Sequence, residues 1–71
     1  MSEERYALYW IPRQGKAYLT DEKKFMNRVY REKSIVREAA RNFMKESIYN
    51  DPAKGSFFYK DLNTNRFTRV F

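Results

Sequence analysis

The strongest structural signal in the sequence lies in residues 56–71, which read SFFYKDLNTNRFTRVF. Two runs rich in aromatic and β-branched residues flank the polar segment 62–65, and this arrangement predicts a β-hairpin. Asn65 tolerates the left-handed backbone conformation that a four-residue loop built on a type I turn requires. The resulting register sets Asp61 opposite Arg66, which is a favourable cross-strand pair.

A second hairpin is predicted in the first twenty residues. Residues 5–11 are dense in aromatic and branched side chains, and Pro12, which cannot donate a ladder hydrogen bond, is expected to end this strand. Gly15 permits a turn, after which residues 16–19 resume the β-type pattern. We therefore expect antiparallel strands over about 5–11 and about 16–19.

Between the two hairpins, residues 21–49 are expected to form one long amphipathic helix. Thr20 is a good N-cap, and two acidic residues follow it in the first turn, where they complement the helix dipole. No apolar residue falls on the helical stripe at residues 32–34, so a bend or break there stays open. The stripe that packs on the sheet comprises Phe25, Val29, Val36, Ala40 and Phe43.

These elements predict one small α+β domain over residues 1–71, in the order ββαββ. The simplest architecture is an antiparallel sheet with the helix, continuous or bent, packed on one face. With 71 residues, of which 18% are aromatic, the chain must build its core from a few large rings. The opposite face of the sheet would be left uncovered.

The composition narrows the chemistry that the protein can perform. The sequence has no Cys and no His, so the usual ligands for zinc, iron and copper are missing, together with the commonest general base and the strongest nucleophile. We expect no metal, no cofactor and no enzymatic activity. Residues 1–4 are acidic where a secretory signal is basic, and no apolar run reaches ~18 residues, so a cytoplasmic protein without membrane contact is expected.

The basic residues suggest an anionic partner. Fifteen Lys and Arg against nine Asp and Glu give a net charge of +6, which favours nucleic acid or an acidic protein. Several cations share the helix face opposite the apolar stripe, and the last hairpin interleaves cations with rings, as single-strand binders do. The alternative is an ordinary solvated helix face. The nucleic-acid candidates are Lys23, Tyr30, Arg37, Arg41, Lys45, Lys60 and Arg69.

The first strand suggests a protein interface. Tyr9 and Trp10 point to opposite sides of it, so at least one large ring should lie on the face away from the helix. An uncovered aromatic face is typical of a protein interface or of a homodimer. The leading hypothesis is a non-catalytic protein-binding module, an inhibitor or adaptor with an acidic protein partner, which uses Tyr9, Trp10 and Tyr59. Nucleic-acid binding is the alternative. The composition, poor in Gly and Cys and rich in Tyr, Phe and Lys, would suit a bacteriophage protein.

A third hypothesis comes from four short stretches: Ala7-Leu8-Tyr9, Gly15-Lys16, Tyr18-Leu19-Thr20 and Phe25-Met26-Asn27-Arg28. Together they resemble the opening of the GIY-YIG nucleases, in which a β-hairpin precedes a helix that carries an arginine. On this resemblance Tyr9 and Tyr18 match the family's two tyrosines, and Arg28 matches its arginine. Ala7 and Thr20 stand where the family's motifs have glycine. The resemblance implies a degenerate nuclease fragment as a remote alternative.

Overall fold

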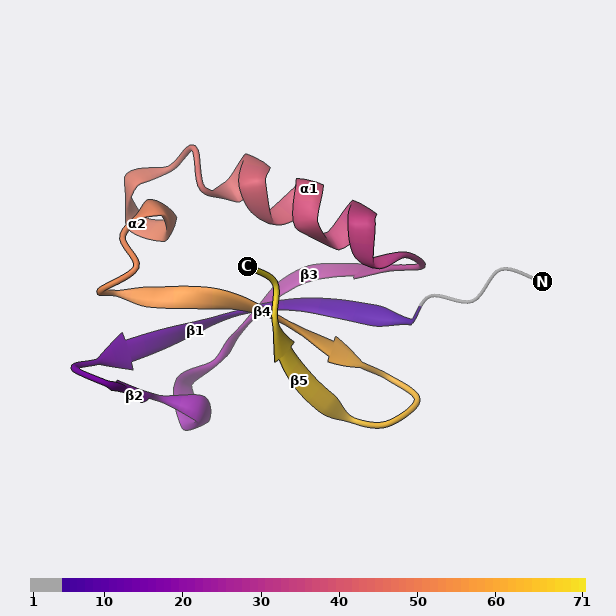
Figure 1. Ribbon diagram of the computed structural model, residues 1–71, viewed down its shortest axis with the longest axis horizontal. Coiled ribbons are helices and arrows are strands. Elements are labelled where there is room, and N and C mark those ends of the chain that lie inside the picture. The colour runs from indigo at the N-terminus through magenta and orange to yellow at the C-terminus, as the bar shows by residue number, and fades with distance from the viewer. Residues whose placement is uncertain (1–4) are drawn as a thin grey trace.

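The computed structural model describes residues 5–71 and places a curled antiparallel sheet beneath a helical layer (Figure 1). The predicted α+β class, with an antiparallel sheet and one main helix, is confirmed. The acidic residues 1–4 lie outside the described residues. The elements are β1 (Tyr6–Gln14), β2 (Ala17–Tyr18), the 3₁₀ helix η1 (Thr20–Glu22), β3 (Lys24–Tyr30), α1 (Lys33–Phe43), α2 (Ser47–Asn50), β4 (Gly55–Asp61) and β5 (Arg66–Arg69).

Strand β1 is the centre of the sheet. It pairs with β4 on one side and with β3 and β2 on the other, and β5 pairs with the outer side of β4. The prediction that Pro12 ends this strand is wrong, because β1 continues to Gln14. The Pro12 carbonyl accepts a hydrogen bond from the Leu19 amide at 2.7 Å, and the next amide, that of Arg13, donates to the Lys54 carbonyl at 2.8 Å. The ladder thus resumes directly after the residue that cannot donate.

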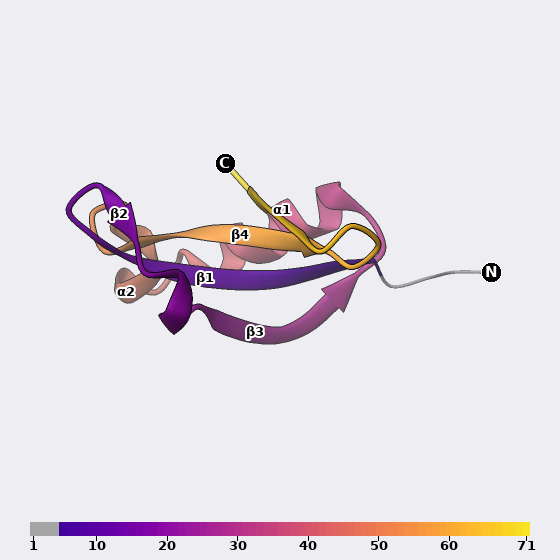
Figure 2. The ribbon, with the colours of Figure 1, turned by 90° about the horizontal axis from the view of Figure 1, so that it is seen from below.

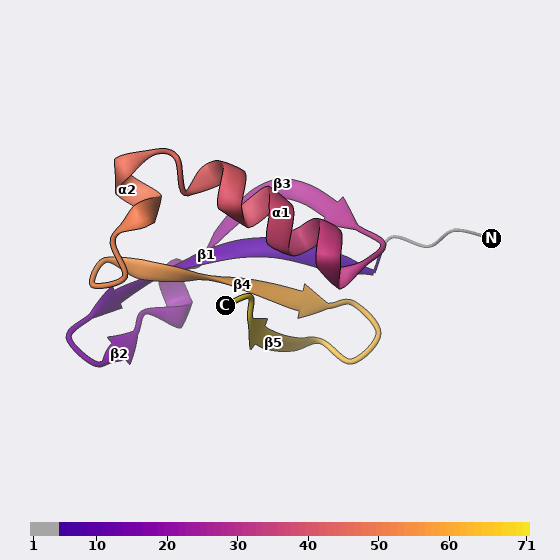
Figure 3. The same cartoon turned by 45° about the horizontal axis from the view of Figure 1, so that its top comes forward.

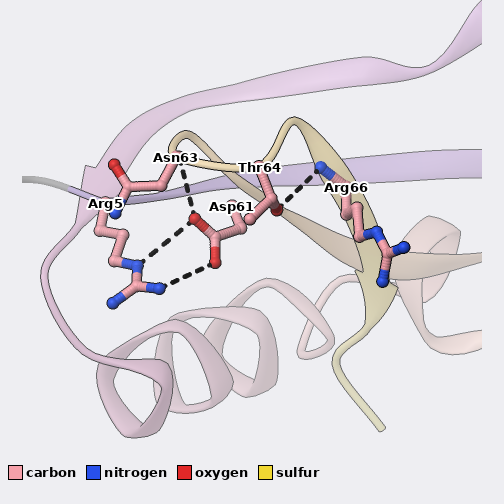
Figure 4. A network of polar contacts seen from close by, with 5 residues as sticks. All are labelled: Arg5, Asp61, Asn63, Thr64 and Arg66. Atoms are coloured by element: carbon pink, nitrogen blue, oxygen red, sulfur yellow. Dashed lines mark hydrogen bonds and ion pairs between the residues drawn. The ribbon is translucent and has the colours of Figure 1, made fainter.

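The last hairpin forms as predicted. Asp61 pairs with Arg66, and Asn65 adopts a left-handed φ of 59°. The Asp61 carboxylate accepts hydrogen bonds from the Arg5 guanidinium at 3.2 and 3.3 Å and from the Asn63 amide at 2.9 Å (Figure 4). The Arg5 hydrogen bonds, together with that of Asn63, hold the pKa of Asp61 below its ordinary value. This carboxylate therefore ties the hairpin loop to the start of β1.

The predicted helix over residues 21–49 is wrong in its first part. The capping residues after Leu19 form only the short η1, and residues 24–30 form strand β3. Phe25 and Val29, which were placed on the helical stripe, are four residues apart. A spacing of four fits the strand period of two as well as the helical period of 3.6, so this pair could not distinguish the two structures.

Strand β3 carries a bulge where it pairs with β1. Ala7 pairs with Val29 and Tyr9 with Phe25, so a single residue of β1 faces three residues of β3. Within the bulge Asn27 has a φ of 60°, which asparagine tolerates better than most residues. The two extra residues are an even number, so Phe25 and Val29 still face the same side of the sheet.

The predicted helix could bend or break at residues 32–34, and the structure has the start of α1 there. Val36 and Ala40 are fully buried against the sheet, as the stripe predicted. The helix ends at Phe43, and α2 begins at Ser47 after a turn. An uninterrupted helix would carry Tyr49 about 9 Å further along the axis, at 1.5 Å per residue. The turn instead returns Tyr49 to the sheet.

The core lies between the helices and one face of the sheet (Figure 3). The Trp10 indole meets the Tyr49 ring edge-on at 5.5 Å and lies against Gly55, where a Cβ atom would approach the indole Cζ2 to 2.5 Å. The Tyr49 hydroxyl accepts a hydrogen bond from Lys24 Nζ at 2.8 Å. None of the helices within residues 5–71 is long and apolar enough to cross a membrane. Ala7 and Ile11 are also buried, on the side of β1 that carries Tyr9. The buried residues of the main core cluster are Tyr6, Leu8, Met26, Val36, Ala40, Tyr49, Phe57 and Val70.

Candidate functional site

The sheet face opposite α1 and α2 is not covered by either helix (Figure 2). Tyr9 and Trp10 point to opposite sides of β1, as predicted, and it is Tyr9 that lies on this open face, because Trp10 packs against the core. Phe25 and Phe67 are 41% and 36% exposed. The curl of the sheet brings β3 and β5 towards each other across this face, and the rings of Phe25 in β3 and Phe67 in β5 stay exposed.

Three rings and two cations meet at the middle of the open face. The Tyr9 ring lies 5.3 Å from that of Phe25 and meets that of Phe67 edge-on at 5.1 Å, between ring centres. The Nζ atoms of Lys23 and Lys60 lie 5.6 and 5.9 Å from the centre of the Phe67 ring. We name these five residues the open-face cluster. They come from β1, β3, β4, β5 and the connection after η1, so only the folded sheet assembles them.

A second group lies where β2 joins the open face. The Tyr18 ring meets Phe58 edge-on at 5.2 Å, and its hydroxyl is 3.2 Å from the Ser56 hydroxyl. The Arg13 guanidinium lies 5.7 Å from the centre of the Tyr18 ring. The hydrogen bond with Ser56, together with the charges of Arg69 and Arg13, lowers the pKa of Tyr18. We name these five residues the Tyr18 corner.

The cations of these surfaces are not neutralised by carboxylates within the part of the chain that the structure describes. Between residues 5 and 71 the one salt bridge joins Arg5 to Asp61, at 3.2 Å. Glu38 and Glu46, which lie near the basic face of α1 in the sequence, form no salt bridge there. The positive charge of the described surface is therefore available to an external anion.

The fold separates the residues that were predicted to bind nucleic acid. Lys23 and Lys60 join the open-face cluster, although Lys23 does not lie on a helix as predicted, and Arg69 joins the Tyr18 corner. Tyr30 is partly buried and packs against the core from β3. Lys45 is exposed in the turn between α1 and α2, off the helix to which it was assigned.

Arg37 and Arg41 line a groove of about 680 Å³ between α1 and β5. Lys33 and Arg69 line it as well, from the start of α1 and from β5. The Lys33 Nζ atom lies 5.9 Å from the centre of the Tyr59 ring, which forms part of the floor. We name this feature the α1–β5 groove. It has four cations, and one carboxylate, that of Glu38, also lines it.

The residues that were predicted to bind a protein do not form one surface. Tyr9 lies on the open face. Trp10 and Tyr59 lie on the helix side of β1 and β4, where both are partly buried against the core. Tyr59 is in edge contact with Tyr6, with ring centres 5.2 Å apart. An interface on the open face would therefore use other rings beside Tyr9.

Several residues of these surfaces were not among those predicted to bind protein or nucleic acid, among them Phe25, Phe67, Lys33, Arg13, Tyr18, Ser56 and Phe58. Phe25 was assigned to the helical core stripe, whereas Phe67 belongs to the last hairpin, whose alternating rings and cations were weighed as a nucleic-acid surface against packing of the sheet. The pattern of β-branched and aromatic residues over 24–30 could have indicated a strand and exposed Phe25. Lys33 stands four residues before Arg37, so the basic ridge could have been extended by one turn. The position of Arg13 depends on the β1–β2 hairpin and carried no local signal.

The chain matches no protein-family model, no curated protein and no solved structure. The resemblance to the GIY-YIG nucleases implied that Arg28 lies on a helix, and this is wrong, because Arg28 lies in strand β3. Across residues 5–71 no three or more His, Cys, Asp or Glu side chains gather in a group that could hold a metal ion.

Proposed function

We propose that this protein binds single-stranded nucleic acid on the open face of its sheet, as a binding domain without catalytic activity. The observation that supports this most is the grouping, on one surface, of rings with cations that form no salt bridge within residues 5–71. Single-strand binders combine aromatic side chains, on which bases stack, with a positive groove that follows the backbone. The open-face cluster supplies three rings and two ammonium groups within a few ångströms of one another.

The open face is long enough for more than one nucleotide. Ser56, Phe58 and Lys60 alternate along the open side of β4, so this strand connects the Tyr18 corner to the open-face cluster. The Tyr18 corner and the open-face cluster each combine rings with two cations. A strand lying along β4 would stack bases at both ends and place its phosphates beside Lys23 and Lys60 at one end and beside the arginines at the other.

Replacement of Phe67 by leucine tests the stacking contact. Leucine keeps an apolar side chain but removes the aromatic face, and Phe67 is 36% exposed in β5, so the fold should tolerate the change. Loss of one stacked base costs about 1–3 kcal/mol, or about 5-fold to 150-fold in Kd. The measurement is fluorescence anisotropy of a labelled oligothymidylate of about six nucleotides. Phe71→Leu, which alters an exposed ring outside the open-face cluster, is the matched control.

Salt dependence provides a second measurement. For single strands the logarithm of the binding constant falls with the logarithm of the salt concentration by about 0.7 per phosphate contact. Lys23→Gln and Lys60→Gln should each reduce this slope by about that amount. An absence of wild-type binding to single strands at about 50 mM salt would refute the proposed function.

A second candidate is the protein-binding module of inhibitor or adaptor type. The observation that favours it is the apolar patch formed by the exposed rings of Phe25 and Phe67 around the half-buried Tyr9, since contiguous apolar surface also marks protein interfaces. An acidic partner would suit the flanking lysines, and a second copy of the chain would suit the rings.

Sedimentation measures whether the chain forms a dimer. A dimer that Phe67→Leu dissociates would support self-association through the open face. Affinity capture at about 0.5 M salt, which weakens nucleic-acid contacts, tests for other proteins retained by the wild type but not by Phe67→Leu.

A further inference from the structure

The α1–β5 groove concentrates positive charge that no salt bridge within residues 5–71 neutralises, although Lys33 and Arg41 lie over the rings of Tyr59 and Phe71. Lys33, Arg37 and Arg41 follow one another at intervals of four along α1, and like charges at this spacing mildly destabilise a helix. Arg69, which pairs with Phe58 across β4 and β5 and also lines the groove, adds a fourth cation at the edge of the groove. A ligand that carries several negative charges would relieve this repulsion by binding in the groove.

The groove and the open face are separated only by the narrow edge of the sheet. Strand β5 is four residues long, Arg66–Arg69, and it is the outermost strand beside β4. Arg69 lines the groove, and its charge also acts on the hydroxyl of Tyr18. One guanidinium is therefore placed to contact a ligand that passes from the Tyr18 corner, over β5, to the helix side of the sheet.

We propose that one single strand of nucleic acid occupies both surfaces, with bases stacked on the open face and the phosphates of its continuation held in the α1–β5 groove. This inference rests on the proposed function of the open face. The chemistry of the two surfaces assigns the parts of the ligand. The open face offers exposed rings, whereas the groove offers four cations around one partly buried ring, that of Tyr59. Phosphates suit the groove better than bases do.

The test compares oligonucleotide lengths. A strand of about six nucleotides, near the short end of the site sizes of single-strand binding domains, should occupy the open face alone, whereas one of about twenty should also reach the groove. The variant Arg37→Gln/Arg41→Gln removes two groove charges on the exposed side of α1. The control Arg31→Gln/Lys45→Gln removes two exposed charges outside the groove and the open face, so both proteins have the same net charge.

With labelled oligothymidylates at about 50 mM salt, the groove variant should bind the long strand about 10-fold more weakly than the control, with a salt slope smaller by about 1.4. The two variants should bind the short strand within about twofold of each other. Equal long-strand affinities of the two variants, or an equal loss for both lengths in the groove variant, would overturn the inference and leave the proposed function standing. If wild type binds neither length, the proposed function fails first, and the inference fails with it.

Discussion

Replacement of Gly55 by alanine tests the packing that turns Trp10 towards the helices. The new Cβ atom would lie 2.5 and 2.7 Å from two carbon atoms of the indole and 2.6 Å from the Ile11 carbonyl oxygen. These distances are well below the ordinary contact of about 3.5 Å. The Ile11 carbonyl cannot retreat easily, because Ile11 is paired with Ser56 in the β1–β4 ladder.

Overpacking of this kind costs about 1–3 kcal/mol, and the rigid carbonyl places Gly55→Ala in the upper part of that range, at about 2–3 kcal/mol. For a chain of this length each kcal/mol lowers the melting temperature by about 4–8 °C, so a decrease of about 8–24 °C is expected. Far-UV circular dichroism during thermal and urea unfolding provides the measurement, because its unfolding transition can be followed without tryptophan fluorescence, which Trp10→Phe removes.

Two comparisons separate the indole contact from backbone strain. Gly15→Ala puts a Cβ in open space at a φ of 63°, so it should cost about 1–2 kcal/mol through conformation alone. In a Trp10→Phe background, which lacks the two clashing carbons, the cost of Gly55→Ala should fall by about 1 kcal/mol, whereas that of Gly15→Ala should not change. If Gly55→Ala costs the same in both backgrounds, Trp10 does not pack against Gly55, and its assignment to the helix side is wrong.

Two further predictions concern the hairpin loop and the bulge. Asp61→Asn removes the charged acceptor of the Arg5 hydrogen bonds. Because the folded-state pKa of Asp61 is lowered, its carboxylate stabilises the fold above about pH 4. This contribution is lost as the pH falls through the lowered pKa. The urea midpoint of the wild type should therefore drop more between pH 7 and pH 3 than that of the variant, and equal drops would contradict the role of Asp61. Asn27→Ala should lower the free energy of unfolding by about 1 kcal/mol, because residue 27 has a left-handed φ. Asn27→Gly should be close to neutral. An alanine variant as stable as the wild type would mean that the bulge does not form.

The elements that could be predicted from the sequence are those that local chemistry defines. The last hairpin was predicted together with the Asp61–Arg66 pair and the left-handed Asn65, because the polar loop fixes both within a few residues. The stripe residues Val36 and Ala40 were also placed correctly. Their helical period is sustained over several turns, and there is no competing strand pattern in α1.

The elements that could not be predicted depend on contacts between distant parts of the chain. Phe25 and Val29 fit both periods, and the choice of a strand is made by pairing with β1, which local propensity does not determine. The alternation of Tyr9 and Trp10 was predictable, but not which of the two faces the helices. That depends on Gly55, some 45 residues further along the sequence, whose missing side chain makes room for the indole.

If the open face binds single strands as proposed, the lysines of the open-face cluster would have one role in the free protein and another in the complex. In the free protein Lys23 and Lys60 lie near the Phe67 ring, where an exposed cation–π contact is worth about 0.5–1 kcal/mol. A stacked base is worth about 1–3 kcal/mol, so a base can displace either ammonium group from the ring with a net gain. The displaced groups remain beside the base, within reach of its phosphates. The same two lysines would thus shield the rings in the free state and hold the backbone in the bound state, whereas an apolar protein partner would have to bury both charges or move them to its rim.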